Sequence, residues 1–432
     1  MGGIQDPCFT FQDFNHIVKY VFTYSDGTQL QKYVKIIVGS GIPRLEIMTE
    51  NNAIIDSKIN YVKASFSLKN CPDYGPLLSE GKIRGRGNAT WNYPKKPYKI
   101  KFENKMEPMG MALNKDWVLL ADYCDKSLMR SIWMFEASKA VGMNYTPDYR
   151  HVDLYLNNEY QGTYLMTELI EEGSKKVNVE DDGFIIECDG HYLEEPCYFI
   201  TEPFSTPYTF KYPDADKHKI IEGDQNYKYI ESYMNELENA LTRISLGDMT
   251  YRKYIDLHSF AKWFVAQEAI ANWDPNMYFV MKSKVDKLEM GPFWDAEWCL
   301  GLADWNDKDG WLFAPNLPRV DAMIWGIRGD YYFKYMLKDL DFVRLLQEEW
   351  ESFKIKIPII KEKIRQESSF IKYSQQRNFK KWPILDEYVR VGLVALGDWQ
   401  LEVDYTLNFF DQRVKWCDEY FNKIVFEGLS QN

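Results

Sequence analysis

Short runs of alternating apolar and polar residues fill the first part of the chain and predict β-strands. Val18 to Tyr24 and Leu30 to Val38 alternate on either side of Asp26-Gly27, a pair typical of tight hairpin turns. The segment from Gly39 to Pro43 is a predicted boundary, and more short strand patterns follow from Arg44 to Leu68. The chain therefore opens with a hairpin that is separate from a second β-rich region.

Helical spacing first appears between Lys126 and Val141, where Asp125 is a plausible N-cap. After Glu168 the chain is charged and irregular to about Asp224. The other expected elements are a hairpin over 152–166, helices over 229–245 and 257–271, a second hairpin pairing 278–281 with 288–294, and a mostly helical remainder over 332–426.

This order predicts an α+β protein with two lobes. A small β-rich N-lobe with one helix comes before a larger, mainly helical C-lobe, which is the order of elements in a protein kinase. The expected divisions are an N-terminal β-hairpin appendage over 1–41, a kinase-like N-lobe over 42–170, and a kinase-like C-lobe over 171–432 with an insertion at about 171–225.

The charge balance excludes one class of partner. The chain has 52 basic and 64 acidic residues and a net charge of −12, whereas nucleic-acid binding needs clustered Lys and Arg. Zinc is not expected, since neither CxxC nor HExxH occurs. No apolar run is long enough to cross a membrane, and no signal peptide opens the chain.

Two aspartates stand in unusual settings around the second predicted hairpin. Asp274 precedes the hairpin, and Asp295 ends it, among Pro, Phe and Trp residues. A turn aspartate that bonds its own backbone explains either one alone. A short hairpin brings its ends together, so both carboxylates could reach one Mg²⁺–phosphate site. Phosphoryl transfer uses such a pair, one acid for the hydroxyl and one for the metal.

A basic strand supplies candidate phosphate ligands. Lys99 and Lys101 share one face of the predicted strand over 97–102, and Lys101 is the first choice because Tyr-Lys-Ile-Lys has the pattern of a phosphate-pairing lysine. The alternative is an ordinary exposed strand face. Glu136 is the acid of the following helix and the expected ion-pair partner. Arg86, in the turn Gly85 to Asn88, could contact phosphate.

A competing interpretation is a glycosidase. Asp295 and Glu297 are two residues apart, so on a strand they would share a face, like a carboxylate pair that cleaves sugars. The tryptophans nearby could stack on sugar rings or simply pack in a core; they are Trp294, Trp298, Trp305 and Trp311.

Several longer motifs resemble the CotH family of spore-coat-type atypical protein kinases. The resemblance covers about Arg44 to Gly301, and its segments are RGRGNATW (84–91), YPKKPYKIKF (93–102), WVLLADY (117–123), DKSLMR (125–130), VDLYLNNEYQGTYLMTE (152–168) and GPFWD (291–295). It implies a kinase-like fold, ATP with Mg²⁺ or Mn²⁺, and transfer of the γ-phosphate to Ser or Thr of proteins. An extracellular or surface setting is also implied.

The resemblance assigns roles to individual residues. Asp274 matches the family's catalytic aspartate, Asp295 its metal-binding aspartate and Lys101 its nucleotide lysine, while Glu168 falls where an adenine-contacting hinge would begin. Two positions depart from the family's pattern. The family often has a further Asn between the catalytic aspartate and the hairpin, and here only Asn276 is available for that position. Glu297 stands where the family often has a second Asp. A non-catalytic surface or adhesion protein on the same scaffold remains the main alternative to a kinase.

Overall fold

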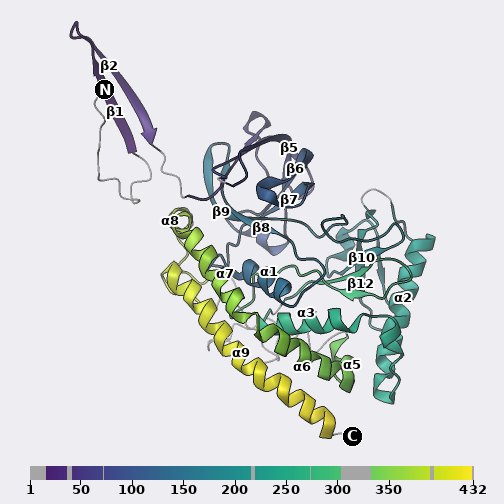
Figure 1. Cartoon of the computed structure of the whole chain (residues 1–432). Coiled ribbons are helices and arrows are strands. Elements are labelled where there is room, and N and C mark those ends of the chain that lie inside the picture. Colours follow the sequence, from purple (N-terminus) through teal and green to yellow (C-terminus); the bar gives the residue numbers. More distant parts are fainter. Residues whose placement is uncertain are drawn as a thin grey trace.

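The computed structural model describes residues 16–36, 41–71, 73–215, 219–272, 274–302, 332–389 and 394–430. Strands dominate the first part of the chain and helices the last part, so the mixed α+β prediction is confirmed (Figure 1). The predicted hairpin is present as a two-stranded sheet of its own, formed by β1 (His16–Thr23) and β2 (Gln29–Ile36) around Gly27.

The second β-rich region closes on itself as a barrel. Its strand order is β3-β4-β5-β6-β7-β9-β8, and β8 pairs with β3 in parallel to close the ring. Alternating residues such as Ile100 and Leu154 fill the interior. The strands are β3 (Arg44–Thr49), β4 (Val62–Lys69), β5 (Leu77–Gly85), β6 (Tyr98–Met106), β7 (Asn114–Leu120), β8 (Tyr149–Leu156) and β9 (Glu159–Thr167).

The helix expected over 126–141 is shorter than predicted, because α1 spans Arg130–Ala140. The carboxylate of Asp125 accepts hydrogen bonds from the backbone N–H groups of Ser127, Met129 and Arg130, and Leu128 has a positive φ of 59°. Asp125 therefore does bond the start of the helix, but a tight turn lies between Asp125 and the first helical residue, Arg130.

The segment from 168 to 224, predicted to be irregular, contains three strands, and the prediction is wrong there. β10 (Phe184–Cys188), β11 (Tyr198–Ile200) and β12 (Pro207–Tyr212) join β13 (Met277–Met281) and β14 (Glu289–Met290) in a five-stranded sheet. Charged residues within these strands, such as Glu187 and Lys211, hid their strand character. The second hairpin is confirmed in its pairing, but β14 ends at Met290, so Asp295 and Glu297 do not lie on a strand.

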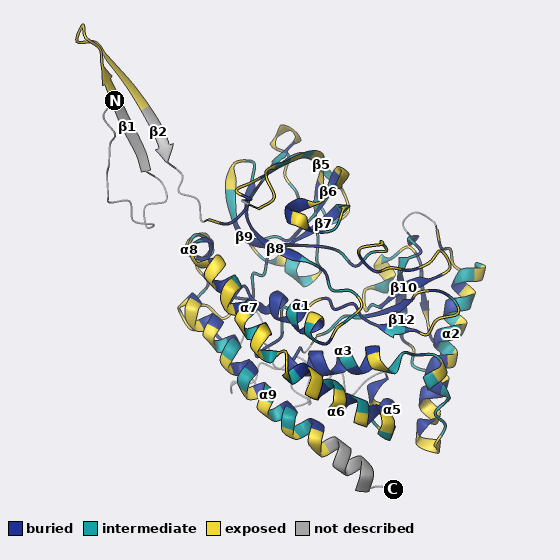
Figure 2. Cartoon of the chain, in the orientation of Figure 1, coloured by how far each residue is buried: buried dark blue, intermediate teal, exposed yellow. Residues whose placement is uncertain are grey.

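Helices make up the end of the chain, as predicted, and among them α8 packs against β9 of the barrel and α7 against α1. α3 lies at the centre, against α1, α6, α9 and β14, and is almost wholly buried (Figure 2). The helices are α2 (Gln225–Thr242), α3 (Leu257–Ala269), α5 (Phe333–Met336), α6 (Leu340–Lys354), α7 (Ile357–Phe370), α8 (Lys372–Lys381) and α9 (Trp399–Ser430). Among the described residues, no helix combines the length and apolar character needed to span a bilayer.

Candidate functional site

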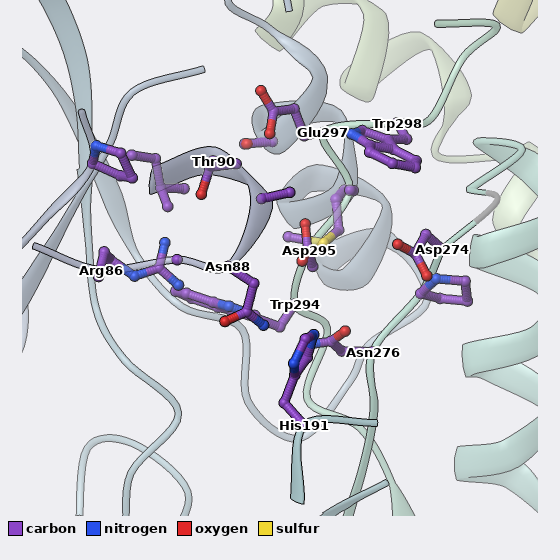
Figure 3. A pocket seen from close by; sticks show the side chains of 18 of the residues that line it. Arg86, Asn88, Thr90, His191, Asp274, Asn276, Trp294, Asp295, Glu297 and Trp298 are labelled. Atoms are coloured by element: carbon purple, nitrogen blue, oxygen red, sulfur yellow. The ribbon is translucent and has the colours of Figure 1, made fainter. Parts of the chain in front are cut away.

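A cavity of about 890 Å³ lies where the barrel, α1 and the five-stranded sheet meet. Figure 3 shows Arg86, Asn88 and Thr90 on one side, Asp274 and Asn276 on the other, and Asp295 between them. The lining residues that matter below are Arg86, Lys95, Asp122, Glu187, Lys211, Asp274, Asn276, Trp294, Asp295, Glu297 and Trp298.

The turn at the end of β5 requires glycine at two positions, Gly85 and Gly87. A Cβ on Gly85 would come within 2.4 Å of the Trp91 ring, and a Cβ on Gly87 within 2.1 Å of the Thr90 hydroxyl. Gly87 also has a φ of +85°, which L-residues rarely adopt. The tight turn that results places Arg86 in the lining of the cavity.

Arg86 is one of the basic groups that line the cavity with the acids. Burial lowers the pKa of its guanidinium, and the charge of Asp295 acts in the opposite direction. Its guanidinium carbon lies 5.8 Å from the centre of the Trp294 ring. A guanidinium stays protonated despite such a shift, so Arg86 is a fixed positive charge on this wall.

Lys95 is a cavity residue that the sequence analysis did not select. Only 1% of it is exposed, and its ammonium group donates a hydrogen bond to the backbone carbonyl of Thr163 in β9. Burial lowers the pKa of Lys95 to about 7, although the nearby acids Asp122 and Glu297 favour the charged form. The positive charge of such a buried lysine is balanced by nearby acids, and an anionic ligand can take over that role when it binds.

Acidic side chains line the opposite part of the cavity. Burial, with repulsion from Asp274, raises the pKa of Asp295 to about 6. Burial, with repulsion from Asp122, raises the pKa of Glu297 to about 8, and Glu297 accepts a hydrogen bond from the N–H of Cys124 at 3.1 Å. Asp295 also has a φ of 60°, a strained conformation that is common at functional sites. This turn, rather than a strand, aims its side chain into the cavity.

Asp274 and Asn276 precede β13 on the same wall. Asp274 as a whole residue is exposed at the cavity surface, but partial burial of its carboxyl group raises the pKa of that group from its ordinary value. The side-chain amide of Asn276 donates to Glu187 at 2.9 Å. The structure thus brings Asp274, Asn276, Asp295, Glu297 and Arg86 to one cavity.

The acids of this cavity suit a divalent cation that is shared with phosphate. Within the described ranges, no three His, Cys, Asp or Glu side chains lie close enough to form a complete metal site. Mg²⁺ usually takes only one or two carboxylates and fills its other positions with water and phosphate oxygens. Asp295 is buried and is repelled by the neighbouring Asp274, so both acids would be stabilised by such a cation and the donor set fits it.

Lys99 and Lys101 lie outside the cavity, which corrects the expectation for the phosphate lysine. They stand on the outer face of the barrel, because Tyr98, Ile100 and Phe102 take the inner face. The nearest carboxylate oxygens belong to Asp116 on β7, at 3.6 Å from Lys99 and 2.9 Å from Lys101. The predicted ion pair between Lys101 and Glu136 is therefore wrong.

Glu136 and Glu168 have other partners and do not line the cavity. Glu136 bonds the ammonium of Lys139 at 2.8 Å and the hydroxyl of Tyr149 at 2.9 Å. Glu168, just past β9, accepts hydrogen bonds from the N–H of Ala112 and the hydroxyl of Tyr145, both at 2.8 Å. Glu136 thus links α1 to β8, and Glu168 links the end of β9 to the loops that carry Ala112 and Tyr145, so these carboxylates are satisfied without a ligand.

The tryptophans of the sugar-stacking alternative divide in two. Trp294 and Trp298 line the cavity, while Trp305 and Trp311 lie outside the described residues. Because 291–298 is not a strand, the argument that Asp295 and Glu297 share a strand face no longer holds.

Comparison with known proteins matches the chain to one family. A search of curated proteins gives no match to this chain. The family model described as CotH kinase protein matches residues 83–417, which includes every lining residue named above. The chain belongs to the CotH kinase protein family.

Proposed function

We propose that this protein is a CotH-type atypical protein kinase that transfers the γ-phosphoryl group of ATP to Ser or Thr hydroxyls of proteins. The observation that carries the proposal is the shared cavity: Arg86 and Lys95 on the barrel side face Asp274 and Asp295 on the sheet side. Family membership gives the reaction class, and the cavity gives both the charges for phosphate and the acids for a metal and a hydroxyl.

The lobes belong to the same proposal. The barrel with α1 would be the nucleotide-binding N-lobe over 42–170, and the sheet with the remaining helices would be the acceptor-binding C-lobe over 171–432, with β10–β12 filling the insertion. A secreted or surface setting is proposed from the family alone.

Residue roles follow from charge and position. Arg86 and Lys95 would bind ATP phosphates, and Lys95 takes the role first expected of Lys101, which lies outside the cavity. Asp274, the exposed acid on the facing wall, would orient the acceptor hydroxyl and take up its proton. Its raised pKa makes it a better proton acceptor than an ordinary aspartate.

Asp295, Asn276 and Glu297 would hold Mg²⁺ or Mn²⁺ together with ATP. When bound, the cation supplies positive charge that offsets the charge of the phosphates. It would also favour the ionised forms of Asp295 and Glu297, whose pKa values burial now raises.

A labelling experiment tests this proposal. The protein is incubated with γ-labelled ATP, Mg²⁺ or Mn²⁺ and a mixture of candidate acceptor proteins, and nucleotide binding is measured separately by calorimetry. Asp274→Ala should lower transfer by about 100- to 10,000-fold and leave nucleotide affinity nearly unchanged, since a general base acts in the chemical step. Asp404→Ala, on α9 and away from the cavity, is the matched control.

Two further variants separate the roles within the cavity. Lys95→Met should weaken nucleotide binding with and without metal, whereas Asp295→Ala should weaken it only when metal is present. Absence of ATP binding by the parent protein would contradict the proposal and favour a non-catalytic surface protein. Cleavage of model glycosides, lost in Glu297→Gln, would instead support the carbohydrate-active alternative.

A further inference from the structure

Glu187 is a buried acid in the middle of the five-stranded sheet, and it lines the cavity beside Asn276. Its residue is 6% exposed. In the strand register, Glu187 of β10 stands opposite Tyr278 of β13 and opposite Thr209 of β12. Two hydrogen-bonded neighbours fix its backbone, so its side chain has a defined place beside the start of β13.

Three groups surround the Glu187 carboxylate. The Asn276 amide nitrogen lies 2.9 Å from one oxygen, and the Lys211 ammonium lies 2.9 Å from the other. Lys211 is two residues from Thr209 and therefore points to the same face of the sheet. The hydroxyl of Tyr278 also hydrogen-bonds Glu187.

The chemistry of the carboxylate decides how Asn276 is oriented. The Asn276 NH₂ group donates to one Glu187 oxygen, and a carboxylate paired with the Lys211 ammonium accepts such a hydrogen bond, so Asn276 turns its NH₂ group toward Glu187. The amide oxygen then points away from Glu187. This oxygen is the atom by which an Asn binds a hard cation. Figure 3 shows Asn276 on the cavity wall below Asp274 and Asp295.

We propose that Glu187 is a positioning residue that holds the side-chain oxygen of Asn276 toward the metal–phosphate site, with Lys211 balancing the buried charge of Glu187. This inference rests on the proposed function, because it concerns the same metal. In this proposal Glu187 acts on the metal through Asn276 and is not itself a ligand. Groups that orient a metal ligand typically change metal affinity by roughly ten- to a hundredfold when removed.

The chain offers a matched control on the same sheet. Glu289 of β14 also bonds an Asn amide and a lysine, namely Asn144 and Lys282, the latter at 2.7 Å, but it does not line the cavity. Glu289→Met therefore removes the same type of network without touching Asn276.

The test measures Mn²⁺ affinity by electron paramagnetic resonance in the presence of a non-hydrolysable ATP analogue. Metal-free nucleotide affinity and melting temperature are measured beside it. Glu187→Met should weaken Mn²⁺ binding by roughly ten- to a hundredfold, as Asn276→Ala does, and the double variant should lose no more than Asn276→Ala alone. Metal-free nucleotide affinity should stay within about twofold, and Glu289→Met should change neither affinity.

Glu187→Gln keeps an acceptor oxygen and the sheet packing, so it serves if Glu187→Met does not fold, and it should show a smaller loss in the same direction. Parent-like Mn²⁺ affinity in a folded Glu187 variant, with a clear loss in Asn276→Ala, overturns the positioning role and leaves the kinase proposal intact. A parent protein that binds no Mn²⁺–nucleotide overturns both.

Discussion

The buried ion pair between Arg130 and Asp125 allows a quantitative prediction. The two side chains are 0% and 1% exposed. Arg130 also donates to the backbone carbonyls of Cys299 at 2.8 Å and Leu300 at 3.3 Å. The pair thus joins the start of α1 to the segment that follows Glu297 in the cavity wall.

Replacing Arg130 by Met removes the positive charge and keeps an apolar side chain of similar length. Asp125 then remains buried without its counter-charge, a situation that costs about 3–5 kcal/mol. With an unfolding entropy of about 2.1 cal/mol/K per residue, a chain of 432 residues has roughly 0.9 kcal/mol/K. We therefore expect the melting temperature of Arg130→Met to fall by about 3–6 °C.

Differential scanning calorimetry at one ionic strength checks this value. Arg243→Met is the control, because its ion pair with Asp248 is exposed, at 44% and 35%, and should shift melting by about 1 °C or less. Adding Asp125→Asn to Arg130→Met should restore part of the loss, since the amide oxygen still accepts from the helix N–H groups and carries no charge. A melting temperature of Arg130→Met equal to that of the control would refute the reasoning.

Three other substitutions give independent checks. Gly162→Ala should destabilise the protein by more than about 1 kcal/mol in thermal unfolding, because Gly162 has a φ of +124° and its Cβ would come within 2.6 Å of the Asn378 side-chain oxygen. Burial alone would raise the pKa of Glu367, but its hydrogen bonds and charge interactions with His151 and Lys363 lower it to about 2, from an ordinary 4.5. The stabilisation by Glu367 is then present above pH 4.5 and lost as the pH falls through 2, so Glu367→Gln should flatten an acid-unfolding curve over that range. Leu346→Ala, at a fully buried site on α6, should cost about 2–5 kcal/mol in denaturant unfolding; a cost below about 1 kcal/mol would contradict the packing of this helix.

The sequence was sufficient to predict those elements whose own residues show alternation or helical spacing. The Asp26-Gly27 hairpin, α2, α3 and the helical end of the chain follow from alternation or helical spacing, and the structure confirms them. Closure of the barrel rests on a parallel pair between β3 and β8, which lie about a hundred residues apart in the sequence, so no local pattern signals it. β10 and β12 were missed because they place Glu187 and Lys211 toward one another, and these charged residues interrupt apolar runs of only two or three residues.

The two lysine assignments show why part of the site was predictable and part was not. Lys101 pairs in register with Asp116 on the neighbouring strand, and that pairing satisfies its charge on the outer face of the barrel. Lys95 lies between Pro94 and Lys96, outside any strand, so no alternation of apolar and polar residues points to its position. Its burial depends on Thr163, Asp122 and Glu297, three partners from three distant segments. A buried charge is tolerated only where such partners converge, and convergence is a property of the fold rather than of any window of sequence. The aspartates were found because aromatic neighbours made them conspicuous; Lys95 could be found only once the cavity was visible.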